Sequence, residues 1–393
     1  KGQFQIAAQV TDGVLDYAEG WPRIENIRAD LLFERDRMEI TGRSGRILGA
    51  SIANVRVAIP SLSASHPVLT VNGSAEGPTE EFLAYVRRSP VRGMIDGLTD
   101  PFRADGRGRL QLRLDLPLDD LARTRVAGEY RLAGGSVTVD PRLPPIARVQ
   151  GRVNFPESTL TVNDVRGEFI GGPVTISGGS QPPAGVAVVA RGETTVQGIR
   201  ALVDHPWLER LQGGAPYSAT VSVKGGQPQV SFESSLRGVA INLPPPLGKA
   251  AADTLPLRVD LHPAADRDRI ALGVGTIVAT EFHRVRRGDA MVVQRTGVLL
   301  GPVPGESPRV PERAGTNIQG TLRAFDLERW RPLLAGGGGD GEASFDLRVG
   351  TLDLFGKRLN EAKIRGATEN TGWNLNIAAQ ELQGDVSYRA EGR

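Results

Sequence analysis

The stretch Gly106–Leu118, GRGRLQLRLDLPL, decides the fold class of this 393-residue chain. Leucine stands at every even position from Leu110 to Leu118, and charged or polar residues stand between them, namely Arg109, Gln111, Arg113 and Asp115. Successive side chains of a β-strand point to opposite faces, so this stretch builds one apolar face and one charged face. A helix would scatter the same leucines around its circumference. The stretch therefore predicts a strand with one apolar face that something must cover.

The same alternation recurs along the chain and is punctuated by Gly, Pro, Asp and Ser. It predicts roughly 25 strands, interrupted by three short helices. We expect the helices at Thr79–Arg88, Val196–Leu211 and Asp326–Leu334, with Thr79 as a helix cap and a kink or restart at Pro206. The pair Gly134-Gly135 between two alternating runs predicts a hairpin that brings Val137 and Val139 back beside the preceding strand.

These elements predict one continuous segment, residues 1–393, made of successive blocks. The expected blocks are strands over 1–78, a helix and loop insert over 79–101, strands over 102–195, a helix over 196–213, strands over 214–324, a helix and glycine linker over 325–340, and strands over 341–393. The blocks have the style of a repeat architecture, although their sequences differ.

Composition excludes several classes of function. The chain has no cysteine, so it has no disulfide, thiolate metal site or cysteine nucleophile. Its formal net charge is only +2 and its aromatic content is 5%, which disfavours a nucleic-acid partner. Its four histidines are not spaced as metal ligands, and no nucleophile motif or carboxylate pair can be singled out. We therefore expect no enzyme activity, no metal and no cofactor.

The predicted sheet has more apolar face than its helices can cover. Three helices of about 35 residues in total cannot roof so many half-apolar strands. Either the apolar faces meet each other, as in a sandwich, or they curl around something else. An uncovered apolar face of this length would be prone to aggregation.

Several segments carry a resemblance to a known family. They are Gly20–Gly49, Tyr85–Leu118, Val126–Phe169, and Leu236–Leu257 with its LPPPLGKAAADTLPL. On these segments the chain resembles the periplasmic portion of the AsmA-like family, in the YhdP branch, which is related to TamB and YdbH. The shared motifs are turns and strands, and none is a catalytic signature.

The resemblance implies a mainly β fold, in which an elongated, twisted and largely antiparallel sheet curves into an open groove built of repeated multi-strand blocks. It also implies a bridge-like lipid transfer protein that conducts phospholipids between the inner and outer membranes. We accordingly expect a periplasmic segment of an inner-membrane-anchored protein, with its anchor outside these residues. The expected partners are phospholipid acyl chains and, through parts outside this segment, the two membranes and possible envelope proteins.

Combined with the alternation, the resemblance predicts which side chains line the groove. The expected lining residues are Leu110, Leu112, Leu114, Leu116, Val126, Tyr130, Val137, Val139, Val153, Phe155, Leu160, Val162, Phe169, Val174, Ile176, Val186, Val188, Tyr217, Val221, Val223, Val230, Phe232, Leu257, Val259, Ile270, Leu272, Phe345, Leu347, Leu352, Leu354, Trp373 and Leu375. The alternative is a β-rich envelope scaffold without transport, whose same residues form a closed hydrophobic core. Strand register and the inward face at mixed-pattern strands remain open at this stage.

Overall fold

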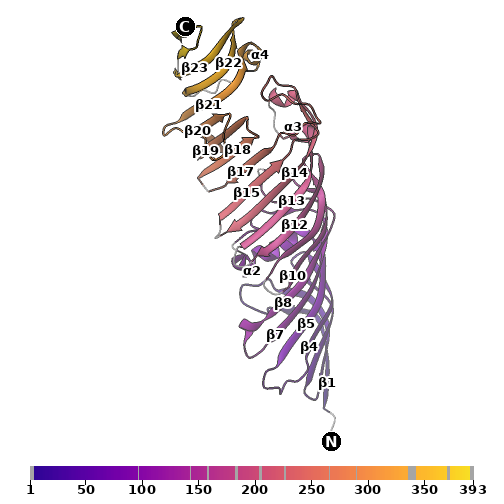
Figure 1. The fold of residues 1–393 in the computed structure, drawn as a ribbon. Helices are drawn as coiled ribbons and strands as arrows, with labels where there is room; N and C mark the ends of the chain where they lie inside the picture. Colours follow the sequence, from indigo (N-terminus) through magenta and orange to yellow (C-terminus); the bar gives the residue numbers. More distant parts are fainter. Residues whose placement is uncertain are drawn as a thin grey trace. The chain divides into compact units, whose positions relative to one another are not determined.

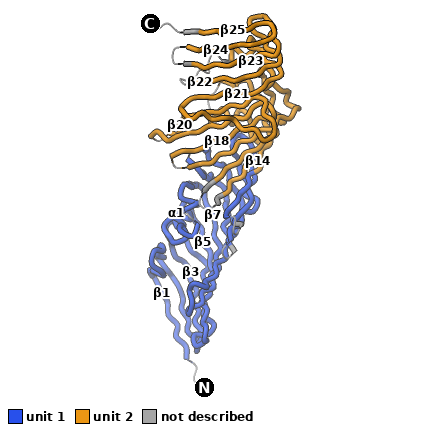
Figure 2. Tube along the Cα trace, turned by 60° about the vertical axis from the view of Figure 1, so that its left-hand side comes forward, with its two compact units in different colours: residues 1–190 blue, residues 191–393 orange. Residues whose placement is uncertain are grey.

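The computed structural model describes residues 4–95, 97–141, 143–156, 159–181, 185–202, 206–224, 227–264, 266–288, 290–334, 342–369 and 372–389. Two compact units divide the chain, residues 1–190 (unit 1) and 191–393 (unit 2), which Figure 2 distinguishes by colour. Twenty-three of the described strands are assigned to one mixed sheet and two to a small separate sheet. The predicted mainly β, largely antiparallel class is confirmed.

Unit 1 is a succession of long antiparallel strands that are hydrogen-bonded in nearly their sequence order (Figure 1). Among the described strands, the first pairs with the second alone, so the sheet is open at that edge. The strands of this succession are β1 (Gln5–Leu15), β2 (Ile24–Glu34), β3 (Arg37–Ile47), β4 (Ala50–Ile59), β5 (Val68–Pro78), β7 (Arg107–Pro117), β8 (Arg125–Ala133), β10 (Ala147–Pro156), β11 (Thr161–Phe169) and β12 (Gly172–Gln181); β13 (Gly185–Thr195) then spans the boundary between the units.

Three bulges in unit 1 have an aspartate or an asparagine in the left-handed conformation. Asp12 in β1, Asn54 in β4 and Asp164 in β11 have φ values of 54°, 55° and 47°, and the strand register shifts at each of them. Aspartate and asparagine tolerate this left-handed conformation better than other residues with a Cβ atom. Each bulge inserts one extra residue. If even-numbered residues lie on a given face before the bulge, odd-numbered residues lie on that face after it.

Unit 2 begins antiparallel and then changes direction. The strands are β14 (Leu211–Lys224), β15 (Gln227–Ser234), β16 (Val239–Ile241), β17 (Leu257–His262), β18 (Arg267–Val274), β19 (Val278–Arg287), β20 (Ala290–Leu300), β21 (Gly315–Asp326), β22 (Ala343–Leu354), β23 (Lys357–Glu369), β24 (Gly372–Ala378) and β25 (Gln383–Arg389). The pairs β20–β21 and β21–β22 are parallel, and the other pairs of described strands in this unit are antiparallel. Parallel neighbours need a crossover. The first crossover is the proline-rich segment 301–314, which packs against Gly297 of β20.

The helices are short and stand between strands. They are α1 (Thr79–Arg87), α2 (Val91–Met94), α3 (Val196–Arg200) and α4 (Leu327–Leu334), with two 3₁₀ turns, Leu121–Arg123 and Pro206–Arg210. The prediction of a helix over 196–213 is wrong in its length, because Pro206 begins a 3₁₀ turn and β14 starts at Leu211. The predicted glycine linker, Gly336–Gly339, lies outside the described residues.

The helix caps also differ from the expectation. Thr79 does not cap α1, because Pro78 holds the cap position and Thr79 is the buried first helical residue. Thr195 caps α3 instead, where its hydroxyl accepts a hydrogen bond from Gly198 N at 3.0 Å. Asp326 acts in the same way before α4, where its carboxylate accepts from Arg329 N at 3.1 Å.

The hairpin predicted at Gly134-Gly135 is wrong. β8 pairs with β7 and β10, whereas β9 (Val137–Thr138) pairs with β6 (Arg103–Ala104) in the separate two-stranded sheet. The reason is the carboxylate of Asp105, which accepts hydrogen bonds from the backbone and hydroxyl of Ser136 and holds the chain away from β8. Val137 and Val139 therefore leave the row of residues in which they were predicted.

Unit 2 contains a true hydrophobic core near α4. Its buried members are Leu322, Val349, Leu352, Leu359, Ala362 and Ile377. A neighbouring aromatic group joins the loop LPPPLGK to the helix: Trp330 is buried, lies 6.1 Å from the rings of Trp207 and Phe325, and donates its Nε1–H to Pro245 O at 2.9 Å. The loop thus serves as a packed turn against α4.

Candidate functional site

The leucine row of β7 lies in register with apolar residues on both neighbouring strands. Across from Leu110, Leu112 and Leu114 on β8 are Tyr130, Gly128 and Val126. On β5 the residues opposite Leu110 to Leu116 are Ala75, Gly73, Val71 and Leu69. Directly paired residues share a face, so these three strands present one apolar surface.

That surface continues through the other strands of unit 1, and we call it the apolar face of unit 1. Register links it to Ile6, Ala8 and Val10 of β1, Ala29, Leu31 and Phe33 of β2, Met38 and Ile40 of β3, Val57 and Ile59 of β4, Val153 and Phe155 of β10, Val162, Val165 and Phe169 of β11, and Val174 and Ile176 of β12. Leu160 directly precedes β11 with the parity of Val162, and Val188 of β13 lies beside Gly178 of β12. The expected residues of unit 1, except Val137 and Val139, are thus brought onto neighbouring strands.

Unit 2 has a second such surface, the apolar face of unit 2. Register links Tyr217, Ala219 and Val221 of β14, Val230 and Phe232 of β15, Leu257, Val259 and Leu261 of β17, Ile270, Leu272 and Val274 of β18, Val278 and Phe282 of β19, Val298 and Leu300 of β20, Ile318 and Leu322 of β21, Phe345, Leu347 and Val349 of β22, Ile364 of β23, and Leu375 and Ile377 of β24. Trp373 has the parity of Leu375, and Leu352 and Leu354 pack with the core cluster. The side chain of Val223 lies outside the described residues.

These apolar side chains are only partly covered. Leu110, Leu112, Leu114 and Leu116 are all half-buried, whereas their polar neighbours Arg109, Gln111 and Arg113 are exposed. The chain exposes 24450 Å² of surface. Two separate globular domains of half its mass would together expose only about 18,000 Å². The excess means that, over the described residues, much of the sheet has no second layer packed on it.

The opposite face of the sheet is charged and wet. Arg113 pairs with Asp115 at 3.3 Å, and Arg258 bonds both Asp260 and Glu233 at 2.7 Å. The arginines of these pairs keep about 60% of their side-chain surface exposed. Arg258 lowers the pKa of Asp260 through its hydrogen bond to that carboxylate. Because its arginines are exposed, this face is a solvated exterior. Exposed ion pairs of this kind contribute little stability.

Helix α1 touches the apolar face of unit 1 through aromatic residues. The ring of Phe82 lies 4.9 Å from that of Tyr130 on β8. One helical turn later, the Tyr85 hydroxyl lies 3.0 Å from that of Tyr17, and its ring lies 5.9 Å from Trp21. Tyr17 and Trp21 belong to the connection between β1 and β2. Burial raises the pKa of Tyr85 and of Tyr130, so both stay neutral.

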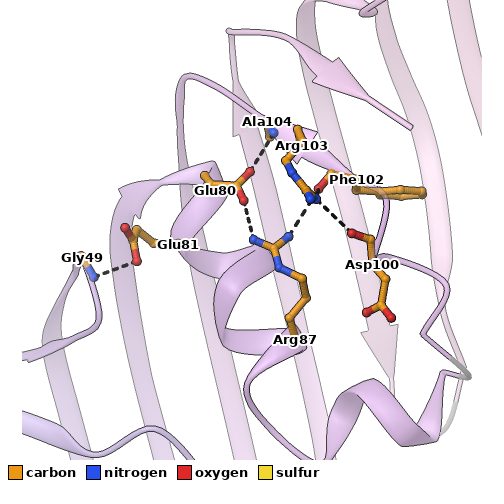
Figure 3. Close-up of polar contacts among 8 residues, drawn as sticks. All are labelled: Gly49, Glu80, Glu81, Arg87, Asp100, Phe102, Arg103 and Ala104. Atoms are coloured by element: carbon orange, nitrogen blue, oxygen red, sulfur yellow. Dashed lines mark hydrogen bonds and ion pairs between the residues drawn. The ribbon is translucent and has the colours of Figure 1, made fainter. Parts of the chain in front are cut away.

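Polar contacts hold α1 in this position (Figure 3). Glu81 accepts a hydrogen bond from Gly49 N at 3.1 Å, in the turn between β3 and β4. Glu80 accepts from Ala104 N at 2.9 Å and pairs with Arg87, whose guanidinium also donates to Phe102 O at 3.3 Å. Both glutamates lie in the first helical turn and Arg87 in the last, which suits the helix dipole. The insert between β5 and β7 is therefore fixed at both ends.

Sequence reasoning missed the partners of α1 and one ion pair. Phe82 is an apolar residue within the helix predicted over Thr79–Arg88, but nothing local indicates that it meets Tyr130, 48 positions further along. The pair Asp268–Arg284 sits where an alternating pattern predicts apolar residues, and only strand pairing reveals it. Within the described ranges, no group of three or more His, Asp and Glu side chains could hold a metal ion.

Comparison with known proteins identifies the family. The YhdP protein family matches residues 1–393. The chain belongs to the YhdP family. It is also similar to the intermembrane phospholipid transporter YhdP of Escherichia coli (strain K12), with 21% identity over 405 residues that cover 99% of this chain and 31% of the relative. The chain thus spans about a third of that relative's length. No solved structure matches significantly. None of the described helices is long and apolar enough to cross a membrane.

Proposed function

We propose that this member of the YhdP family conducts phospholipids along the apolar faces of its two units, across the periplasm between the inner and outer membranes. The observation that carries the proposal is the register of the apolar rows: strand after strand, apolar residues pair with apolar residues on a face that stays partly exposed. Such a face needs a covering of the chemistry that acyl chains have. The name of the E. coli relative supports the same substrate.

The energetics favour a continuous apolar path. Each CH₂ group removed from water contributes about 0.8 kcal/mol, so exposing two 16-carbon acyl chains costs on the order of 20 kcal/mol. A lipid that slides along an apolar face avoids most of this barrier while its headgroup stays at the wet edge. The proposal therefore needs no catalytic group, metal or cofactor.

The contacts of α1 support a hollowed shape for the apolar face of unit 1. Strands β2 and β8 are separated by five interstrand spacings, about 24 Å in a flat sheet. Trp21, just before β2, nevertheless contacts Tyr85, and Tyr130 of β8 contacts Phe82. Tyr85 and Phe82 lie one turn apart on α1. A sheet curved toward α1 would bring β2 and β8 within reach of this one helix, which supports a groove whose inner side is the apolar face.

In this proposal the chain is a periplasmic segment of a longer, inner-membrane-anchored protein. The membranes, and any envelope protein partners, are contacted by parts outside these 393 residues. The competing scaffold function predicts instead a closed core around the leucine row of β7.

Photo-crosslinking in living cells tests the proposal. A photoreactive amino acid is placed at Leu112, on the apolar face, or at Arg113, its neighbour on the polar face. Lipid adducts at position 112 and not at 113 are the expected result, because only position 112 faces the proposed path. If the folded protein gives no adduct at either position, the leucine row is an ordinary core and the scaffold function takes its place.

A further inference from the structure

The apolar face of unit 2 contains charged side chains at one place. Among the described positions that register assigns to this face from β14 to β20, the charged ones are Asp268, Arg284 and Arg286. All three lie where β18 begins and β19 ends. Asp268 stands two residues before Ile270 and pairs with Arg284, which stands two residues after Phe282. The charges therefore mark one edge of an otherwise uncharged and mostly apolar surface.

Asp268 and Arg284 form a two-point ion pair. Arg284 Nε donates to Asp268 Oδ1 at 2.7 Å, and Nη2 donates to Oδ2 at 2.5 Å. The Asp268 side chain is 1% exposed, whereas that of Arg284 is 23% exposed. The carboxylate is thus enclosed and the guanidinium reaches the surface. Burying this pair removes water from its charges, which costs free energy that apolar residues at these positions would not cost. The pair Arg258–Asp260 on the polar face stays in contact with water.

The guanidinium has binding capacity left. An arginine carries five N–H donors, and its contacts with described residues use two of them. Its planar fork matches the oxygens of a phosphate group, and charge-assisted bonds of this kind are strong. The neighbouring apolar residue on β20, Val293, pairs with Arg284 and is 49% exposed. A cationic donor group and uncovered apolar surface therefore lie next to each other.

We propose that Arg284 is a phosphate-contact site for the lipid that the apolar face of unit 2 carries, and that Asp268 is its positioning residue. This inference rests on the proposed function and adds to it the residues that contact the phosphate group of the phospholipid. The acyl chains lie along Ile270 and Phe282 while the phosphate oxygens accept hydrogen bonds from Arg284. Asp268 fixes the guanidinium plane at the edge of the face, where a headgroup remains hydrated.

Two lipids that differ only in the headgroup test this site. The purified chain is incubated with phosphatidylglycerol or with diacylglycerol, both carrying the same fluorescent acyl chain, and bound lipid is measured on a native gel. The variant is Asp268→Asn with Arg284→Gln, which removes both charges and leaves no buried charge unpaired. Arg258→Gln, an ion-paired arginine of the polar face in the same unit, is the matched control.

The expected result is a preference for phosphatidylglycerol of about tenfold, the size of one charge-assisted hydrogen bond. The double variant loses this preference and binds diacylglycerol as the unmodified chain does, and Arg258→Gln keeps it. A preference that survives in the folded double variant overturns the site. Equal binding of both lipids by the unmodified chain overturns the site and leaves the proposed function standing, whereas binding of neither lipid overturns both. If the unmodified chain shows no preference between the lipids, and inorganic phosphate binds it but not the double variant, the site takes the free anion and the lipid assignment is wrong.

Discussion

The ring of Phe155 on β10 occupies the space above Gly128 on β8, where a Cβ atom would overlap it. The same relation recurs one strand away, where the Tyr130 hydroxyl occupies the space above Gly108 of β7. In both cases a large side chain of the apolar face lies across a neighbouring strand. Glycine at these points leaves room for the rings to lie over a neighbouring strand.

We expect Gly128→Ala to lower the free energy of unfolding by about 1–3 kcal/mol, because the new methyl group must displace the Phe155 ring. Urea denaturation measures the change. In the background of Phe155→Ala the same substitution should cost less, since the overlap with the ring is gone and only the contact of the added Cβ with Gln111 O, at 2.9 Å, remains. Gly273→Ala in β18, where the added Cβ meets open space, is the control. An equal loss for both glycines would show that backbone effects, and not the ring, are responsible.

Leu112→Asp combined with Leu114→Asp should abolish lipid binding and transport while the protein still folds. Both leucines are half-buried, so the new carboxylates can reach water, but they would interrupt the apolar path. Native-gel lipid binding and circular dichroism measure the two properties. Gln111→Asp, on the polar face of the same strand, should leave both unchanged. Normal lipid binding by a folded double variant would refute a lipid path over β7.

Glu80→Ala should loosen α1 without unfolding the sheet. The substitution removes the partner of Arg87 and leaves the half-buried N–H of Ala104 without its acceptor. Local protection from hydrogen exchange over residues 79–104 should fall by about 1–3 kcal/mol. Glu76→Ala, an exposed residue of β5, should change little. Unchanged protection in Glu80→Ala would mean that the aromatic contacts alone hold α1.

Tyr217 should make the stability of unit 2 fall at high pH. Its hydroxyl is buried and has no hydrogen-bond partner among the described residues, and burial raises its pKa to about 12. The unfolded chain ionises near pH 10 and the folded one only near 12. The ionisation of Tyr217 therefore leaves the free energy of unfolding unchanged below pH 10 and lowers it as the pH rises toward 12.

Tyr217→Phe tests this directly. It should be neutral or raise stability by about 1 kcal/mol at pH 7, because no buried hydroxyl is left unsatisfied. It should also flatten the loss between pH 10 and 12 in urea denaturation. A steep loss that persists in this variant would assign the titration to other groups.

The period-two alternation predicted most of the fold class and most of the proposed lining. Alternation is a local property of extended backbone, so Leu110 to Leu116 could be assigned to one face without knowing their neighbours. The helix of residues 79–87 was equally local, since its acidic first turn and its end before Ser89-Pro90 lie within the segment. The strand register then showed which of these apolar rows lie side by side in the sheet, which alternation alone does not indicate.

Pairing across the sheet decided the rest. At Asp12, Asn54 and Asp164 a bulge shifts the parity, so that Val162 and Val165 lie on one face although their numbers differ in parity. Asp105 draws β9 away from the main sheet, and Arg284 meets Asp268 sixteen residues away. The sequence by itself determined strand, helix and alternation, because these depend on backbone geometry within a few residues. The tertiary structure alone decided which strands pair, where parity changes and which charges meet, because those depend on contacts between residues far apart in the chain.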